Sequence, residues 1–196
     1  MNSLTLDQLE HLEQNGWVFL QIPEIWQDLL SQAQALQGKN QFKPAEIKTS
    51  LSTDQSQLIR NDLIHWVKDD TSIDAEKLFN QQINYMMYQI KDYFRVGLDH
   101  FEAHYALYPP NHFYQRHSDQ KKENNKRQFS FVYYLNPKWK AEYGGELVGY
   151  HGDTSEREFG VFPNGGTLAL FKSDIEHEVC ISNSARFSIT GWMRTR

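Results

Sequence analysis

The sequence predicts an α+β fold in which an N-terminal layer of helices buttresses a double-stranded β-helix, or jelly roll. Two observations predict it. Before about residue 100, apolar side chains recur at helical spacing in three segments, whereas after it short apolar or alternating runs are separated by turn residues. The length of 196 residues suits one domain with a sizeable core. We therefore expect a support layer over residues 1–100 and a jelly-roll core over residues 101–196.

The support layer begins with a helix expected over residues 4–15. Thr5 and Gln8 have the spacing of a capping box, and Gly16 provides a helix end. The expected apolar stripe of this helix comprises Leu4, Leu6, Leu9 and Leu12.

Four further segments of the support layer have clear periodicity, and one does not. We expect a strand at 17–20, a helix at 24–37 stopped by Gly38, a strand with Leu63 and Trp66 within 59–70, and a helix at 74–95. The face of the last helix is expected to carry Leu78, Ile83, Met86 or Met87, and Ile90. The polar stretch at about 39–58 lacks periodicity, so we expect a functional or mobile loop there.

The second half of the chain has the pattern of short strands separated by turns. The expected strands are 103–108, 113–117, 129–135, 145–150, 158–162, 167–171, 177–181 and 186–193. Proline, glycine and asparagine occur between them, as in Pro109-Pro110-Asn111 and Gly144-Gly145. About eight strands of this kind indicate a double-sheet jelly roll.

The composition narrows the class of protein. A net charge of −5 disfavours a nucleic-acid partner, which usually selects a basic surface. The single cysteine, Cys180, excludes an internal disulfide, and we expect it to be a small buried residue rather than a nucleophile. Without a long apolar run or a signal peptide, we expect no membrane association and a cytoplasmic location. The sequence does not indicate an oligomeric state.

The triplet His117-Ser118-Asp119 carries the first functional signal. Side chains two residues apart on a strand point the same way, so the triplet offers an imidazole and a carboxylate to one point. A later histidine would complete a 2-His-1-carboxylate face, which leaves three open positions on a six-coordinate iron. The triplet alone is close to a chance match, so it is a hypothesis that needs structural context.

His177 is the preferred third ligand because it opens an apolar strand, and Arg186 follows nine residues later. We expect a hairpin to bring the two together. Alternation places Arg186, Ser188, Thr190 and Trp192 on one face of their strand and Phe187 and Ile189 on the other. An arginine facing the interior needs an anionic partner, and a small-molecule carboxylate would serve. An exposed arginine and a structural histidine remain the alternative. The competing histidines His11, His65, His100, His104, His112 and His151 lack supporting neighbours.

Several segments together make the chain resemble a known family. They are IRNDLIHW at 59–66, YPPNHFYQRHSD at 108–119, FVYYLNPKW at 131–139, GGEL at 144–147, FKSDIEHEV at 171–179 and RFSITGW at 186–192. In this order they resemble the 2-oxoglutarate- and Fe(II)-dependent dioxygenases, and within them the prolyl 4-hydroxylase branch that includes oxygen-sensing prolyl hydroxylases and their bacterial relatives. The likeness runs from about residue 38 to 194.

The resemblance implies roles for individual residues. His117, Asp119 and His177 correspond to the iron ligands, and Arg186 to the residue that pairs with the distal carboxylate of 2-oxoglutarate. The residues implied to line the cosubstrate pocket are Tyr108, Tyr134, Leu147 and Thr190. Alternation also places Tyr134 inward with Val132 and Tyr133 outward.

Further residues are implied to act toward the substrate. Trp192 falls near the metal and Arg127 near the mouth of the site, while Arg60 and Asp62 form a charged pair that steadies the loop at 39–58. Each has a plainer alternative. Tyr108, Tyr134 and Trp192 would then be core aromatics, Arg127 a solvated residue, and the charged pair an exposed one of little consequence.

The sequence therefore predicts a dioxygenase that uses Fe(II), 2-oxoglutarate and O2, with ascorbate as a candidate addition. The predicted reaction is hydroxylation of a prolyl residue in a protein or peptide, with conversion of 2-oxoglutarate to succinate. Oxidation of free proline or another small metabolite is an alternative, as is a non-catalytic metal-binding jelly roll. A nucleic-acid demethylase is disfavoured by the acidic balance.

Overall fold

The computed structural model describes residues 2–45, 59–120, 125–152 and 154–196. Its elements are α1 Leu6–Asn15, β1 Trp17–Gln21, α2 Trp26–Gly38, β2 Lys43–Pro44, β3 Leu63–Trp66, α4 Asp74–Phe94, β4 Leu98–Tyr108, β5 His112–His117, β6 Arg127–Tyr134, the 3₁₀ helix η1 Ala141–Tyr143, β7 Leu147–Tyr150, β8 Arg157–Val161, β9 Thr167–Lys172, β10 His177–Ser182 and β11 Arg186–Thr195. Every strand expected after residue 100 is present, so the predicted jelly-roll architecture is confirmed.

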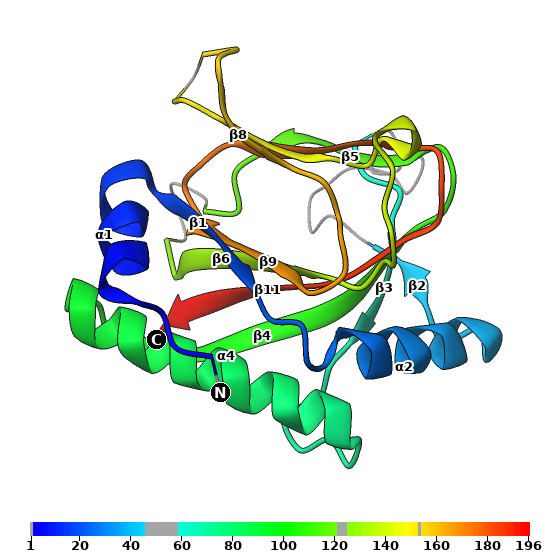
Figure 1. Cartoon of the computed structure of the whole chain (residues 1–196), viewed down its shortest axis with the longest axis horizontal. Coiled ribbons are helices and arrows are strands. Elements are labelled where there is room, and N and C mark those ends of the chain that lie inside the picture. Colours follow the sequence, from blue (N-terminus) through cyan, green and yellow to red (C-terminus); the bar gives the residue numbers. More distant parts are fainter. Residues whose placement is uncertain (1, 46–58, 121–124, 153) are drawn as a thin grey trace.

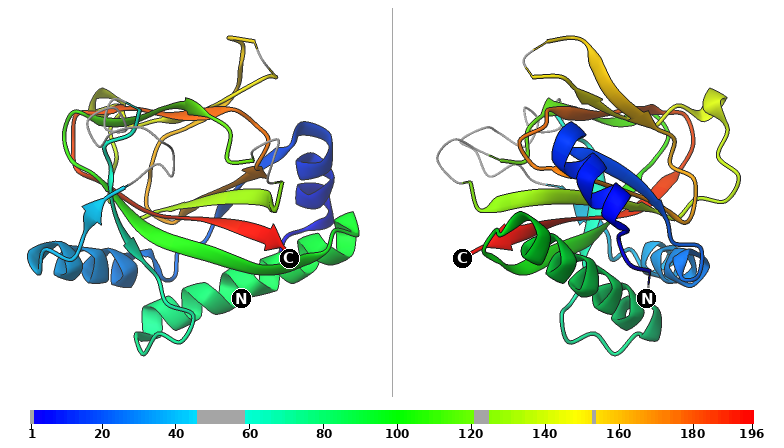
Figure 2. Two further views of the ribbon diagram at one scale, coloured as in Figure 1. Left: turned by 180° about the vertical axis from the view of Figure 1, so that it is seen from behind. Right: turned by 60° about the vertical axis from the view of Figure 1, so that its left-hand side comes forward.

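Two antiparallel sheets face each other, and the helices cover the outer side of the larger one (Figures 1 and 2). The large sheet has the strand order β1-β9-β6-β11-β4-β3-β2, and the small sheet the order β5-β10-β7-β8. Each strand of the large sheet therefore has one face toward the helices and one toward the small sheet. The two faces carry separate hydrophobic clusters.

The alternation of β11 is as the sequence predicts. Phe187 and Ile189 belong to the helix-facing cluster, whereas Arg186, Thr190 and Trp192 line the cavity between the sheets. On β6 the same rule holds, because Val132 and Tyr134 lie in the inner cluster and Tyr133 in the outer one. β11 pairs with β4 and β6 along nearly its whole length, so these inward residues occupy fixed positions in the sheet centre.

The helices follow the predicted segments with two local differences. α1 has the predicted capping box, in which the Thr5 side chain accepts from the Gln8 backbone and the Gln8 side chain from the Thr5 backbone. Leu6, however, is 62% exposed, because it lies on the solvent side of α1 while Leu9 and Leu12 face the core. On α4, Leu78 was expected in the core but is exposed, and its neighbour Phe79 packs into the core instead. Gly38 is the last residue of α2, whereas the sequence predicted that the helix would end just before this glycine.

Two further expectations about chain organisation need correction. β10 and β11 do not form a hairpin, because β10 belongs to the small sheet and β11 to the large one. The chain crosses between the sheets in the short turn after Ser182, which still leaves His177 and Arg186 on one cavity. The polar stretch expected as a loop contains the short strand β2, which pairs with β3. The rest of it, residues 46–58, lies outside the described residues.

The expected division at residue 100 falls inside β4, and strands from both sides of it share the large sheet. We therefore propose that the support layer and the jelly-roll core act as one domain.

Candidate active site

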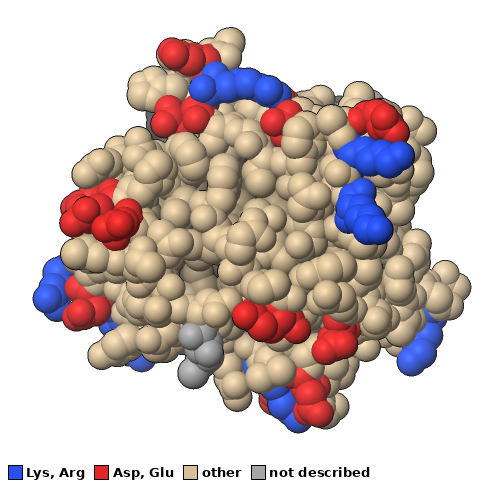
Figure 3. Space-filling view, in the orientation of Figure 1, with Lys and Arg blue, Asp and Glu red and all other residues tan. Residues whose placement is uncertain are grey.

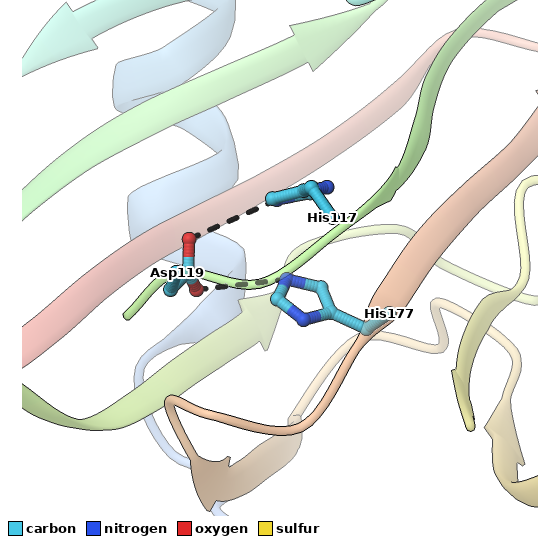
Figure 4. A group of neighbouring side chains, drawn as sticks. All are labelled: His117, Asp119 and His177. Atoms are coloured by element: carbon cyan, nitrogen blue, oxygen red, sulfur yellow. Dashed lines mark ion pairs between the residues drawn. The ribbon is translucent and has the colours of Figure 1, made fainter. Parts of the chain in front are cut away.

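Two histidines and one aspartate meet at the cavity between the sheets (Figure 4). The Nε2 atom of His117 lies 3.7 Å from Asp119 Oδ1, and Nε2 of His177 lies 3.5 Å from Asp119 Oδ2. One donor atom from each side chain falls within 4.8 Å of the others. Two imidazoles and a carboxylate therefore point at a common centre, as a 2-His-1-carboxylate site requires.

Both imidazoles are oriented by backbone carbonyl groups. Nδ1 of His117 lies 2.7 Å from the Gln115 carbonyl oxygen, and Nδ1 of His177 lies 2.9 Å from that of Ile175. A proton on each Nδ1 satisfies these contacts and leaves the Nε2 lone pair for a metal. Burial, reinforced by the neighbouring His177, lowers the pKa of His117 well below its ordinary value. His117 is therefore neutral at physiological pH, in the form that binds metals.

The Asp119 carboxylate is buried yet remains ionised. Burial alone would raise its pKa, but His177, His117, the Ser130 hydroxyl and the Trp192 indole outweigh that effect and lower it. Ser130 donates a 2.7 Å hydrogen bond to Asp119 Oδ2. A negative carboxylate beside two imidazoles is a suitable donor set for a divalent cation.

The geometry of the His-x-Asp triplet differs from the sequence expectation in one respect. β5 ends at His117, and Asp119 lies in the following bend rather than on the strand. A register shift between β5 and β10 leaves four residues, Tyr114 to His117, opposite three on β10, His177 to Val179. This bulge places both Tyr114 and His117 on the cavity side, where their rings stack with centroids 3.6 Å apart.

Arg186 occupies the opposite end of the cavity and is 1% exposed. Its Nε donates to the Gly145 carbonyl at 3.0 Å, and Nη1 donates to the Ser188 hydroxyl at 3.4 Å. The guanidinium carbon lies 4.9 Å from the ring centre of Tyr108 and 5.1 Å from that of Tyr134. The close approach requires glycine at 145, where φ is +67° and a Cβ atom would stand 3.2 Å from the arginine side chain.

Arg186 has no acidic partner among the described residues, and its Nη2 atom is buried without a hydrogen bond to any of them. The hydroxyl of Tyr134 is in the same condition. Burial raises the pKa of that hydroxyl to about 12, so it stays protonated as a donor. An unpaired buried cation is costly, which makes a bound carboxylate the fitting partner. These donors fit a dicarboxylate such as 2-oxoglutarate, and the histidine-aspartate cluster fits Fe(II).

The remaining predicted residues lie around the same cavity. Arg60, Asp62, Tyr108, Leu147, Thr190 and Trp192 are on its wall. Tyr134 lies behind Arg186, and Arg127 stacks on Trp192 with its guanidinium carbon 3.6 Å from the ring centre. Arg127 also approaches Asp119 and Glu102 at 3.9 Å and 3.5 Å, so it is not a purely solvated residue.

Arg60 and Asp62 form a two-point ion pair, with nitrogen–oxygen distances of 2.8 Å and 2.6 Å. Their side chains are 12% and 1% exposed, so the alternative of an exposed pair is wrong. Arg60 lies over the Tyr114 ring at 4.3 Å. The pair is thereby connected through Tyr114 to the imidazole of His117.

Three residues of the site were not singled out from the sequence. His104 lines the cavity between the rings of Trp66 and Trp192, and its Nδ1 is buried without a partner among the described residues. His104 lies four residues before Tyr108 on β4, so alternation places both side chains on the cavity side. This pattern could have identified His104 from the sequence. Tyr114 depends on the bulge in β5, and Ser130 on contacts between distant strands, so neither had a local signal. Cys180 is half-buried and outside the cavity.

Comparisons with known proteins agree with this geometry. Residues 103–194 match the 2OG-Fe(II) oxygenase superfamily. The structure is similar to that of a Pseudomonas putida prolyl-4-hydroxylase, with 29% identity, a TM-score of 0.85, and coverage of 97% of this chain and 98% of that one. A prolyl hydroxylase from Trichoplax adhaerens, solved with a hypoxia inducible factor oxygen degradation domain peptide fragment, gives 24% identity, a TM-score of 0.83, and coverage of 95% and 87%.

A more distant structure shares the fold. The viral collagen prolyl hydroxylase of Paramecium Bursaria Chlorella virus-1, solved with 2OG, gives 15% identity and a TM-score of 0.60 over 94% of this chain and 98% of that one. No curated protein sequence matches the chain. In the described residues, no helix has both the length and the apolar character needed to cross a membrane.

The fold, the cavity and these likenesses support one class of protein. The match of residues 103–194 supports a 2-oxoglutarate/Fe(II) oxygenase, and the similarity to the Pseudomonas putida enzyme over nearly the whole chain supports the prolyl hydroxylase branch.

Proposed function

We propose that this dioxygenase hydroxylates a prolyl residue in a protein or peptide and couples the reaction to decarboxylation of 2-oxoglutarate to succinate. The observation that carries the proposal is the shared cavity of the histidine-aspartate cluster and the unpartnered Arg186. A metal-binding jelly roll without catalysis would have no use for a buried carboxylate clamp.

His117, Asp119 and His177 would hold the metal through two Nε2 atoms and one carboxylate, and form the catalytic centre. When bound, Fe(II) supplies the oxygen activation that hydroxylation of a C–H bond requires. Three ligands from the protein leave three positions for the cosubstrate and O2.

Arg186 would bind the distal carboxylate of 2-oxoglutarate through its free Nη2 atom, and the Tyr134 hydroxyl would donate to the same group. Tyr108, Leu147 and Thr190 would form the walls that fix the orientation of the cosubstrate. Because β4 places His104 four residues from Tyr108, about 13 Å along the strand, the cosubstrate cannot fill both ends of the cavity.

The substrate would therefore approach from the end of Trp192, Arg127 and His104. Arg60 and Asp62 stand on the same wall, beside Tyr114. The choice of a prolyl residue in a peptide as substrate is supported by the likeness over nearly full length to the Pseudomonas putida prolyl-4-hydroxylase, and by the Trichoplax adhaerens enzyme solved with a peptide.

On the face shown in Figure 3, acidic and basic side chains lie interspersed in small groups.

The test is succinate formation from 2-oxoglutarate by the purified enzyme with Fe(II) and ascorbate. Three additions are compared: blocked proline-centred peptides, free L-proline and buffer alone. Stimulation by the peptides, with a mass gain of one oxygen atom on proline, is the expected result. Stimulation by free proline alone would favour the small-metabolite alternative.

Mass spectrometry of cellular proteins with and without the gene would then identify the target. Absence of oxidised proline together with active 2-oxoglutarate turnover would exclude the prolyl substrate while leaving the oxygenase class intact. A requirement for ascorbate and a cytoplasmic location stay predictions.

A further inference from the structure

Two buried serine hydroxyls lie directly behind the Asp119 carboxylate. Ser130 on β6 is 1% exposed, and Ser173, which follows β9, is 0% exposed. The Ser130 oxygen lies 2.7 Å from Asp119 Oδ2 and 2.8 Å from the Ser173 oxygen. Neither residue belongs to the metal-binding triplet, and neither lies in the segment that carries Asp119.

The direction of these hydrogen bonds follows from the charge of Asp119. An ionised carboxylate only accepts, so Ser130 must donate its proton to Oδ2. Ser130 then has no proton left for Ser173, and Ser173 must donate to Ser130. The result is a directed chain from Ser173 through Ser130 to Asp119, in which each bond polarises the next.

Ser173 also fixes the backbone on both sides of the metal site. Its carbonyl accepts from the Ser118 hydroxyl at 3.1 Å and from the Gln120 amide at 2.9 Å. Its amide donates to the Gln128 carbonyl at 3.0 Å. The bend that carries Asp119 is thereby attached to the turn that leads to His177, although the two are more than fifty residues apart in sequence.

We propose that the Ser173–Ser130 pair is a positioning device that holds Asp119 as a one-oxygen metal ligand. This inference rests on the proposed metal site and function. The Ser130 hydroxyl donates a hydrogen bond to Oδ2, so Oδ1 would be the oxygen that binds the metal. A carboxylate free to rotate could bind through both oxygens and close a position needed by the cosubstrate or O2. The hydroxyl pair thus preserves the open coordination of the site.

The test is titration of the purified protein with Mn(II), with free metal measured by electron paramagnetic resonance. Ser130→Ala should weaken Mn(II) binding about 10- to 100-fold, the usual effect of losing a group that orients a ligand. Ser130→Thr keeps the hydroxyl and should bind close to wild type. Ser173→Ala should have a smaller effect, and the double alanine variant should be no worse than Ser130→Ala, because Ser173 acts through Ser130.

Ser182→Ala is the matched control. Ser182 is equally buried, and its hydroxyl donates to the Ser184 carbonyl at 2.6 Å, away from the metal ligands. It should change thermal stability without changing Mn(II) affinity. The absorption spectrum of bound Co(II) gives a second measurement, since a two-oxygen aspartate in Ser130→Ala would change the coordination number.

Wild-type affinity and an unchanged Co(II) spectrum in Ser130→Ala would overturn the proposal, as would equal losses in Ser130→Ala and Ser182→Ala. If the wild type itself bound no Mn(II), the metal site and this inference would both be wrong. If the wild type bound Mn(II) but oxidised no proline, only the proposed substrate would be wrong.

Discussion

The two faces of the large sheet have opposite characters, although the same strands form both. On β11, Phe187, Ile189 and Met193 pack into the cluster beneath the helices. The residues that alternate with them face the small sheet: Arg186, Ser188, Thr190 and Trp192. Arg186 and Ser188 are almost completely buried there. Alternation thus separates a stabilising face from a chemical face one residue at a time.

The inner face carries polar atoms that the described part of the protein leaves unpartnered. They include Arg186 Nη2, Tyr134 OH and His104 Nδ1. Each unsatisfied group costs roughly 1–3 kcal/mol. Among the residues that the structure describes, the outer face bears no comparable set. The helix-facing core therefore supplies the stability that allows the inner face to remain prepared for ligands. Changes on the two faces should separate activity from stability.

The largest effect is expected at the metal cluster. Asp119→Ala, or His117→Ala, should abolish 2-oxoglutarate turnover while the folded structure persists, because the cation loses one of three ligands. Succinate assays and circular dichroism measure the two properties. Normal turnover in either variant would contradict the metal assignment.

Arg186→Gln should affect the cosubstrate next most strongly. Loss of a charged hydrogen-bonding partner should raise the KM for 2-oxoglutarate about 10- to 100-fold, with Mn(II) affinity unchanged. Without 2-oxoglutarate, the variant should be at least as stable as the wild type, because an unpaired buried charge has been removed. An unchanged KM would place the clamp elsewhere.

Ile189→Ala tests the outer face. Ile189 is 0% exposed, and its truncation should lower the free energy of unfolding by about 2–5 kcal/mol, measured by urea denaturation. Since the side chain points away from the cavity, the KM for 2-oxoglutarate should not change. A large rise in KM without destabilisation would show that the two faces are not separable.

The pH dependence of stability offers the finest comparison. Burial lowers the pKa of His104 to about 4 from its ordinary 6.5. Between these values the unfolded chain binds a proton that the folded chain does not, so stability falls as the pH decreases. His104 should account for about 3 kcal/mol of this loss between about pH 7 and about pH 4.

His104→Gln removes the titrating group and should flatten the curve by that amount relative to the wild type, in urea unfolding at several pH values. The other histidines are common to both proteins, so the difference isolates His104. Parallel curves for the two proteins would mean that His104 is solvated in the folded state.

Local physical rules account for much that the sequence predicts correctly. The capping box of Thr5 and Gln8 needs only neighbouring residues, and so does the alternation that sends Arg186 inward and Phe187 outward. The strands after residue 100 were predicted for the same reason, since turn residues separate them. The candidate metal ligands His117, Asp119 and His177 were reached by adding motif order to these rules.

Tertiary structure alone decided the features that depend on distant partners. The helical pattern did not distinguish Leu78 from Phe79, because only packing on the sheet determines which of the two is covered. Strand pairing placed β10 and β11 in different sheets, and a bulge brought Tyr114 onto His117.

The sequence by itself thus determined the class of fold, the inward face of β11 and a metal triplet. The structure decided that Arg60 and Asp62 are buried, that the Nη2 atom of Arg186 lacks a partner among the described residues, and that two serines from distant parts of the chain lie behind Asp119. The reason is physical: backbone geometry sets where a side chain points within a few residues, whereas its neighbours are set by pairing between strands far apart in the chain.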